Sequence, residues 1–227
     1  MKNGRKPAKA KTRVVVVDDH PMMREGLIQL ISQERDLSVC GEADTAAAAL
    51  ELVARERPNL VLADISLPDK NGLELIKDIQ AMAPGTIVLV ISMHDESLYA
   101  ERVLRAGGRG YIMKQEGGKK LLDAIHQVLD GRIYVSDKIS ARILEIFSGA
   151  RPKSSSPIDL LTDREFEVFQ LIGQGLDVKE IADRLHLSVK TAEVHRANIK
   201  QKLKLRSVGD LIRHAVRWIE SNPGAGG

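Results

Sequence analysis

Five polar side chains stand at the ends of short apolar runs in the first half of the sequence. They are Asp18, Asp19, Asp64, Ser92 and Lys114. Three carboxylates that lie close together repel one another, and a divalent cation with oxygen ligands, such as Mg²⁺, relieves that repulsion. A carboxylate beside Mg²⁺ can attack phosphorus, a hydroxyl can hydrogen-bond a phosphoryl oxygen, and an ammonium can neutralise its charge. These residue types therefore favour phosphoryl transfer to an aspartate, provided that the fold brings them together.

Alternating apolar runs and helical patterns predict a fold that does so. Strands are predicted at residues 14–17, 37–41, 59–63, 86–91 and 110–113, and helices at 21–32, 45–56, 72–82, 96–106 and 119–129. Short, wholly apolar strands that alternate with helices predict a parallel sheet covered on both faces. Ligands of such sheets bind at the carboxyl ends of the strands, which is where the five polar residues stand.

The order and spacing of these motifs resemble the receiver domain of bacterial response regulators. The resemblance covers residues 12–133 and rests on Val-Val-Asp18-Asp19-His20-Pro, Asp64-Ile-Ser-Leu-Pro68 with Gly72, Val-Ile-Ser92 and Gly110-Tyr-Ile-Met-Lys114. It implies a flavodoxin-like, doubly wound sheet of five parallel strands in the order 2-1-3-4-5. Two departures are minor, since Ser92 keeps the hydroxyl of the usual Thr and Leu67 stands where Met is common.

The same resemblance assigns a role to each residue of the site. Asp64 is expected to accept the phosphoryl group, and Lys114 is expected to pair with it. The expected Mg²⁺ ligands are Asp18, Asp19, Asp64 and the backbone carbonyl of Ser66, with Asp19 favoured for direct contact. Ser92 is expected to move toward the phosphoryl group and to let Tyr111 turn inward. His20 is expected to be non-catalytic, because no second His or Cys lies at metal-ligand spacing.

Charge is distributed unevenly along the 227 residues, whose net charge is +3. Residues 1–13 hold six basic side chains and no acid, and residues 184–206 hold seven basic side chains and one acid. The basic block near the end of the chain favours a polyanion such as nucleic acid as its partner. The single cysteine, Cys40, excludes an intramolecular disulfide, and no apolar run approaches a membrane span. A cytoplasmic protein without a membrane partner is expected.

The second half of the sequence predicts a small all-α domain of four helices. Helix N-terminal motifs occur at Thr162-Asp-Arg-Glu165, Asp177-Val-Lys-Glu180 and Ser188, and a fourth helix spans residues 208–219. The tight turn before Ser188 is typical of a helix-turn-helix. The apolar stripe of the last helix is expected to pack in the core, with Trp218 as a packing anchor.

The third of these helices divides into an inner and an outer face at 100° per residue. Ala192, Ile199 and Leu203 are expected to face the core. The residues predicted to lie along DNA are Lys190, Thr191, Glu193, Val194, His195, Arg196, Ala197, Lys200 and Lys202. Outer side chains would meet base edges, while basic side chains and the helix N-terminus would contact phosphates.

These motifs resemble the LuxR-type helix-turn-helix over residues 158–222. One departure is Ala192, where the family commonly has a larger aliphatic side chain. The resemblance implies a homodimer in the phosphorylated or DNA-bound state, with Val208, Leu211, Ile212 and Ala215 as candidate contacts. The whole chain thus resembles response regulators of the NarL/FixJ class. The expected parts are a disordered basic tail (1–12), a receiver domain (13–133), a connecting helix and linker (134–157), and the DNA-binding domain (158–222).

Three functions are weighed on this basis. The first is a transcription regulator of a two-component system, in which a sensor histidine kinase phosphorylates Asp64 and thereby controls binding to double-stranded DNA. The second is a constitutive DNA-binding protein whose receiver domain only binds other proteins. The third, an enzyme, is disfavoured because Asp-Asp-His-Pro stands where a dehydrogenase needs G-x-G-x-x-G, and neither a Walker loop nor G-x-S-x-G is present.

Overall fold

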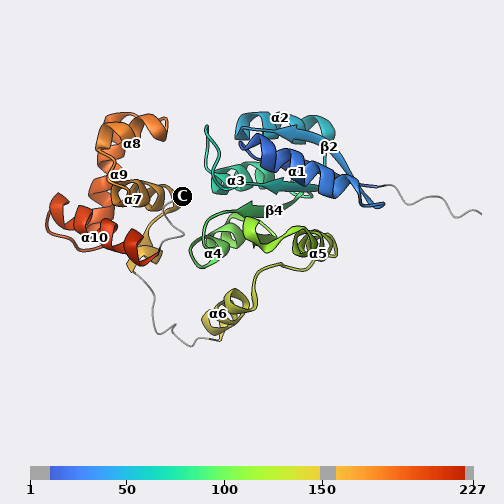
Figure 1. Cartoon of the computed structure of the whole chain (residues 1–227). Coiled ribbons are helices and arrows are strands. Elements are labelled where there is room, and N and C mark those ends of the chain that lie inside the picture. The colour runs from blue at the N-terminus through green and yellow to red at the C-terminus, as the bar shows by residue number, and fades with distance from the viewer. Residues whose placement is uncertain (1–10, 149–156, 223–227) are drawn as a thin grey trace, which may run out of the picture. The chain divides into compact units, whose positions relative to one another are not determined.

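The computed structural model describes residues 11–148 and 157–222 (Figure 1). Most of the predicted basic tail and part of the predicted linker lie outside these residues. The chain divides into two compact units. One contains the residues up to Ser92 together with Val103–Tyr134, and the other contains Met93–Arg102 and the residues from Val135 onward.

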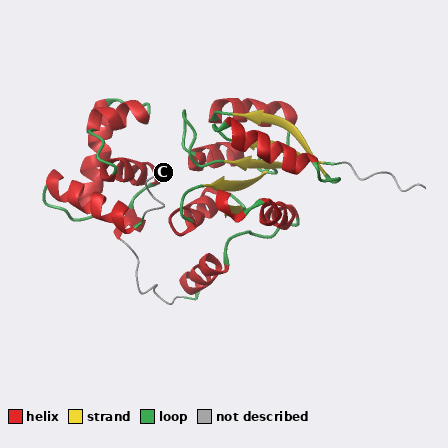
Figure 2. Cartoon of the chain, in the orientation of Figure 1, coloured by secondary structure: helices red, strands yellow, loops and turns green. Residues whose placement is uncertain are grey.

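Five parallel strands form the sheet of the first unit (Figure 2). They are β1 (Thr12–Val17), β2 (Leu37–Ala43), β3 (Leu60–Ala63), β4 (Ile87–Ser92) and β5 (Gly110–Met113). Their order is β2-β1-β3-β4-β5, which confirms the predicted doubly wound sheet. Residues 14–17 and 60–63 are 0% exposed, because the central strands of a parallel sheet are covered on both faces.

Helices lie against both faces of this sheet. They are α1 (Pro21–Ser32), α2 (Ala46–Glu56), α3 (Gly72–Met82) and α5 (Gly118–Leu129), and a 3₁₀ turn η1 (Lys114–Glu116) follows β5. Helix α4 (Glu96–Ala106) is divided between the two units after Arg102. Leu27 of α1 and Ile125 of α5 share one core cluster with Val14 and Val16 of β1. Because side chains alternate along a strand, Val15 and Val17 face the other side of the sheet.

Polar caps fix where two of these helices begin. The hydroxyl of Thr45 accepts a hydrogen bond from the backbone N–H of Ala48, and the side chain of Asn71 accepts one from Leu73. The carboxylate of Asp69 accepts two more at the start of α2, from the backbone N–H groups of residues 46 and 47. Each bond satisfies a donor that a helix N-terminus would otherwise leave without a partner.

The second unit contains the four predicted helices and two further elements. Its elements beyond residue 134 are α6 (Asp137–Phe147), a 3₁₀ turn η2 (Pro157–Leu160), α7 (Asp163–Gly173), α8 (Val178–Arg184), α9 (Val189–Lys202) and α10 (Val208–Ser221). Three of these helices, α7, α8 and α10, begin with complete capping boxes. His186, with φ at 52°, makes the left-handed turn between α8 and α9.

Aromatic packing holds α7 against α10. Trp218 of α10 meets Phe166 and Phe169 of α7 edge-on, with ring centroids 5.6 and 5.5 Å apart. Edge-to-face pairs of this kind add about 0.5–1.5 kcal/mol to the burial of the rings. The prediction that Trp218 is a packing anchor is therefore confirmed. Among the described residues, no helix is both long enough and apolar enough to cross a membrane.

Candidate functional site

The carboxyl ends of β1, β3 and β5 bring three charged side chains into contact. Lys114 Nζ lies 2.6 Å from Asp64 Oδ2 and 2.8 Å from Asp18 Oδ2. The side chains of Lys114, Asp64 and Asp18 are only 3%, 4% and 0% exposed. One buried ammonium thus pairs with two buried carboxylates, at the sheet edge where the sequence predicted that they would meet.

Burial and neighbouring charges shift the pKa values of this cluster. Burial raises the pKa of Asp64, and the nearby Lys114 ammonium only partly opposes that effect. Burial acts to lower the pKa of Lys114, but Asp64 and Asp18 outweigh it, so this pKa lies above its usual value. Two carboxylates with one ammonium leave excess negative charge in a buried site, which favours binding of a further cation.

Asp19 and His20 stand at the mouth of the same site. The Asp19 side chain is 34% exposed, and its Oδ1 lies 2.7 Å from His20 Nδ1. Asp18 Oδ2 and Asp19 Oδ1 are buried atoms without a hydrogen bond of good geometry. Ligand atoms of Asp18, Asp19, His20 and Asp64 all lie within 4.8 Å of one another. Carboxylate oxygens with unused acceptor capacity in a negatively charged site fit the ligand preference of Mg²⁺.

The remaining receiver residues surround this cluster. The backbone N–H of Ser66 donates a 3.3 Å hydrogen bond to Asp64 Oδ1, which orients the carboxylate. Ser92 ends β4 and is 0% exposed, while Tyr111 lies in β5 and is 1% exposed. Both side chains are thus buried in this structure.

Helix α9 presents most of the predicted DNA-contacting residues to solvent. Lys190, Thr191, Glu193, Val194 and Ala197 are exposed, and Arg196 and Lys200 are partly exposed. The helix starts at Ser188, whose hydroxyl accepts a hydrogen bond from the backbone N–H of Thr191. Ala192 and Ile199 are 0% exposed, which confirms the predicted inner face of the helix.

Two residues of the predicted DNA-contacting set are turned toward the domain instead. Lys202 Nζ lies 2.6 Å from Glu165 Oε2, a capping-box carboxylate that is 4% exposed. The Nδ1 atom of His195 is buried, and burial lowers the pKa of His195, with the Arg164 charge adding to the effect. The sequence could not reveal this, because Glu165 and Arg164 belong to a helix about thirty residues earlier.

The candidate dimer contacts of α10 also divide into two pairs. Leu211 and Ala215 are 0% exposed, whereas Val208 and Ile212 are 38% and 45% exposed. A side chain that is wholly inside the domain core cannot meet a second chain without unfolding. The structure therefore leaves only Val208 and Ile212 of this set available for a contact.

Comparison with known proteins decides the family. The model for response regulator receiver domains matches residues 14–126, and the model for bacterial regulatory proteins of the luxR family matches residues 159–215. The oxygen regulatory protein NreC of Staphylococcus epidermidis is 32% identical, over 90% of this chain and 97% of its own length. The chain is a response regulator with a LuxR-type DNA-binding domain. It regulates transcription under the control of phosphorylation, as the sequence predicted.

Solved structures agree with this assignment. RcsB from Salmonella enterica serovar Typhimurium, bound to the rprA promoter with a phosphomimetic, aligns with a TM-score of 0.65 at 25% identity. That alignment covers 91% of this response regulator and 98% of RcsB. The receiver domain of the putative response regulator NarL from Mycobacterium tuberculosis aligns with a TM-score of 0.53 at 35% identity, over 55% of this chain and 100% of that one.

Gly72 is a residue of this response regulator to which the sequence gave no role. A Cβ atom there would lie 2.6 Å from the backbone O of Asp64 and 2.7 Å from the Cα of Ile65. Both are backbone atoms, so a side chain could be accommodated only if the loop that carries Asp64 moved. The start of α3 thus sets the position of Asp64 through close backbone contact.

We expect Gly72→Ala to slow phosphoryl uptake from acetyl phosphate at least about tenfold, since displacement of a reacting group by 1 Å can cost roughly 100-fold. Initial rates followed by intact-protein mass spectrometry measure the effect. Gly85→Ala is the matched control, because a Cβ atom at Gly85 meets nothing within 4 Å. Equal rates in wild type and Gly72→Ala would contradict the assigned role.

The Lys202–Glu165 pair gives a second prediction, on stability. Burial acts to raise the pKa of Glu165, but Lys202 and the Thr162 cap outweigh it, so this pKa is lowered. The pair therefore stabilises the folded state fully at pH values above the ordinary carboxyl pKa of 4.5. This stabilisation is lost as the pH falls through the lower pKa of the folded state. We expect Lys202→Met to remove about 1 kcal/mol of stability at pH 7 and to flatten this acid dependence.

Urea unfolding followed by Trp218 fluorescence measures this effect, because Trp218 is the single tryptophan of the chain and packs on α7. Lys200→Met is the control, since it removes the same charge from the same helix without touching Glu165. If Lys202→Met weakened DNA binding strongly and left the urea midpoint unchanged, Lys202 would be a DNA contact after all.

Proposed function

We propose that Asp64 accepts a phosphoryl group from a sensor histidine kinase and that this modification controls DNA binding and dimerisation. The observation that carries the proposal is the buried pairing of Asp64 with Lys114 at 2.6 Å. A carboxylate oxygen of Asp64 forms a new bond to phosphorus while the bond from phosphorus to the donor breaks. Lys114, held at the same place by Asp18, stabilises the negative charge of the arriving phosphoryl oxygens.

The acidic cluster is also proposed to bind Mg²⁺. Asp18, Asp19, Asp64 and the backbone carbonyl of Ser66 are the proposed ligand set, and the convergence of the three carboxylates, with ligand atoms within 4.8 Å of one another, supports it. When bound, Mg²⁺ supplies neutralisation of negative charge on the phosphoryl oxygens. The exposed side chain of His20 contacts Asp19 Oδ1 through its Nδ1 atom, so it competes with the metal for that oxygen.

The signal is proposed to leave the site through Ser92 and Tyr111. Ser92 lies at the carboxyl end of β4, beside the strand that carries Asp64, and its hydroxyl is suited to a phosphoryl oxygen. Val90 of β4 is paired with Tyr111 of β5. A displacement of the end of β4 would therefore also displace the backbone that carries the Tyr111 ring. A change in the packing of the buried Tyr111 is the proposed response to phosphorylation.

Double-stranded DNA is the proposed ligand of α9. The exposed side chains of its first half, among them Lys190, Glu193 and Val194, are offered to base edges, and Lys200 offers charge to the DNA backbone. The structure of RcsB dimers on two parallel DNAs describes a dimer of that relative. A homodimer of this chain through Val208 and Ile212 is proposed by analogy, and DNA binding is proposed to take place in the cytoplasm.

One experiment tests the coupling between the two activities. The full chain is treated with acetyl phosphate and Mg²⁺, and the mass and the affinity for duplex DNA are measured together. We expect one added phosphoryl group and tighter, more dimeric DNA binding. A phosphorylated chain with unchanged DNA affinity and unchanged oligomeric state would instead support the constitutive DNA-binding alternative.

A further inference from the structure

The outer edge of the sheet, at β5, is bound by the segment that follows α5. The backbone N–H of Tyr111 donates a 2.9 Å hydrogen bond to the carbonyl O of Tyr134, whose own N–H donates a 3.0 Å bond to the carbonyl O of Arg109. The two bonds form a parallel bridge between Gly110 and Tyr134. Tyr134 therefore extends the edge of the sheet by one residue, although it lies beyond the last helix of the receiver domain.

Gly110 allows this close approach of two backbones. A Cβ atom at Gly110 would lie 2.7 Å from the backbone O of Tyr134 and 2.9 Å from Leu89 Cδ1. The side chain of Tyr134 packs against the core cluster that contains Leu89. Glycine inside a strand often marks a position where another backbone comes close. A side chain at residue 110 would push the segment of Tyr134 away from β5.

The same segment is also attached to α5. Gln127 Nε2 donates a 2.6 Å hydrogen bond to the carbonyl O of Ile133, and the backbone N–H of Arg132 donates a 3.1 Å bond to the carbonyl O of Gln127. Gly131, with φ at 82°, makes the turn that ends α5. Ile133 is thus held by α5 and Tyr134 by β5. A displacement of β5 relative to α5 therefore acts on the two hydrogen bonds of the bridge.

We propose that the bridge at Tyr134 is the contact through which the receiver domain passes its signal to the connecting helix α6. This inference deepens the proposed function and rests on it. In that function, phosphorylation changes the packing of Tyr111, whose backbone N–H holds Tyr134. The accompanying displacement of β5 stretches the bridge and releases Tyr134, shortly before α6 begins at Asp137.

Amide hydrogen exchange of the full chain, followed by ¹⁵N NMR, tests the bridge itself. Without phosphorylation, the Tyr134 amide should exchange at least about 100-fold more slowly than in an unstructured chain, because it is hydrogen-bonded to the sheet edge. Gly110→Ala should remove most of that protection. Gly85→Ala, where a Cβ atom meets nothing within 4 Å, should keep it. A Tyr134 amide that is unprotected in the wild type overturns the proposal.

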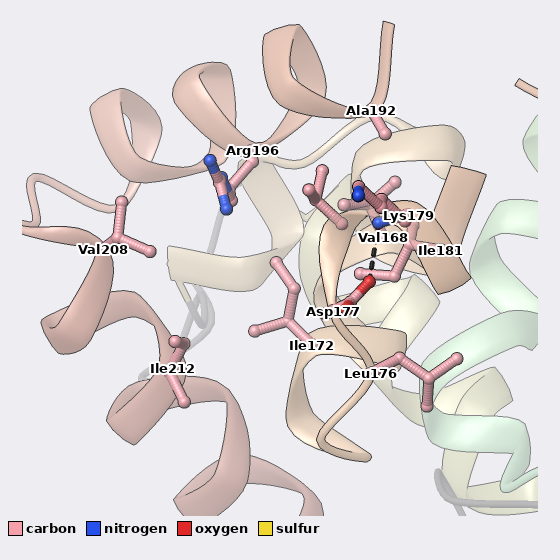
Figure 3. A pocket seen from close by; sticks show the side chains of 11 residues that line it. Val168, Ile172, Leu176, Asp177, Lys179, Ile181, Ala192, Arg196, Val208 and Ile212 are labelled. Atoms are coloured by element: carbon pink, nitrogen blue, oxygen red, sulfur yellow. Dashed lines mark hydrogen bonds between the residues drawn. The ribbon is translucent and has the colours of Figure 1, made fainter. Parts of the chain in front are cut away.

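Reference amides show whether the rest of the fold is intact. The Asp130 amide, which donates to His126 at the end of α5, should stay protected in every variant. In the DNA-binding domain the reference is Ile181, whose amide donates to Asp177. The Ile181 side chain lies in the buried wall of the hollow between α7, α8, α9 and α10 (Figure 3). Loss of protection at the bridge alone distinguishes its release from general unfolding.

A second measurement tests the transfer of the signal. The chain is phosphorylated with acetyl phosphate and Mg²⁺, and uptake is measured by intact-protein mass spectrometry. The Tyr134 amide should then exchange at least about tenfold faster, while the Asp130 amide is unchanged. Gln127→Met removes the side-chain donor that fixes Ile133, so Tyr134 can follow β5. In this variant the exchange should accelerate less than about threefold on phosphorylation.

The outcomes separate this proposal from the proposed function. A phosphorylated chain with unchanged exchange at Tyr134 overturns the proposal and leaves the phosphorylation of Asp64 standing. An acceleration in Gln127→Met as large as in the wild type also overturns it, even if Gly110→Ala fails to fold. A chain that takes up no phosphoryl group overturns the proposed function and the transfer step with it. The measurement without phosphorylation still decides whether the bridge exists.

Discussion

Asp64→Asn is expected to take up no phosphoryl group from acetyl phosphate in the presence of Mg²⁺. An amide has nearly the shape of the carboxylate but is not a nucleophile toward phosphorus, so the chemistry is lost while the packing is kept. Lys114 retains its 2.8 Å contact with Asp18, so the variant leaves no buried charge without a partner. Intact-protein mass spectrometry measures the result directly.

Asp69→Asn is the matched control for this experiment. It makes the same chemical change in the same loop region, but Asp69 caps α2 through the backbone N–H groups of Ala46 and Ala47 and is outside the acidic cluster. This variant should be phosphorylated as readily as the wild type. Labelling that persists in Asp64→Asn would mean that another group accepts the phosphoryl group, and the assignment of the site would fail.

Lys190→Glu is expected to weaken binding to duplex DNA of random sequence at least about tenfold at low salt. Reversal of one charge removes a favourable phosphate contact and adds a repulsive one. The slope of log affinity against log salt should also fall by roughly one. The fold should be preserved, because Lys190 is exposed in the first turn of α9, where an acidic side chain is favourable to the helix.

The control for Lys190→Glu is Arg217→Glu on α10. It changes the net charge of the chain by the same amount at another exposed position of the same domain. Fluorescence anisotropy at several salt concentrations compares the two variants with the wild type. Equal losses in both would indicate a general effect of net charge, and α9 would then have no special place in DNA binding.

The residue pattern alone determined the parallel sheet and the place where its chemistry gathers, and the family resemblance added the strand order. Every side chain of an apolar run such as Val14–Val17 is buried only if the sheet is covered on both faces. The turn residues after each run set the position at which the strand ends. Asp18, Asp64 and Lys114 stand directly after such runs, so their meeting at one sheet edge follows from the topology. The resemblance to known families then supplied roles that residue types alone could not.

The helical periodicity of the second half was equally informative up to a point. It separated the inner residues Ala192 and Ile199 of α9 from the outer ones, because an isolated helix has a fixed angle per residue. It could not say which outer residues another helix would cover. Lys202 is drawn inward by Glu165, and His195 lies near Arg164, through contacts that no local pattern contains.

Tertiary structure alone decided the features that depend on packing between distant segments. The pairing of Lys202 of α9 with Glu165 of α7 joins residues that are 37 positions apart in sequence, and the close approach of Gly72 to the backbone of Asp64 depends on the path of the loop between them. The same is true of the split of α10 into buried and exposed apolar residues. Periodicity specifies which way a side chain points, whereas the space and the partners that it finds there depend on which other segments pack against it.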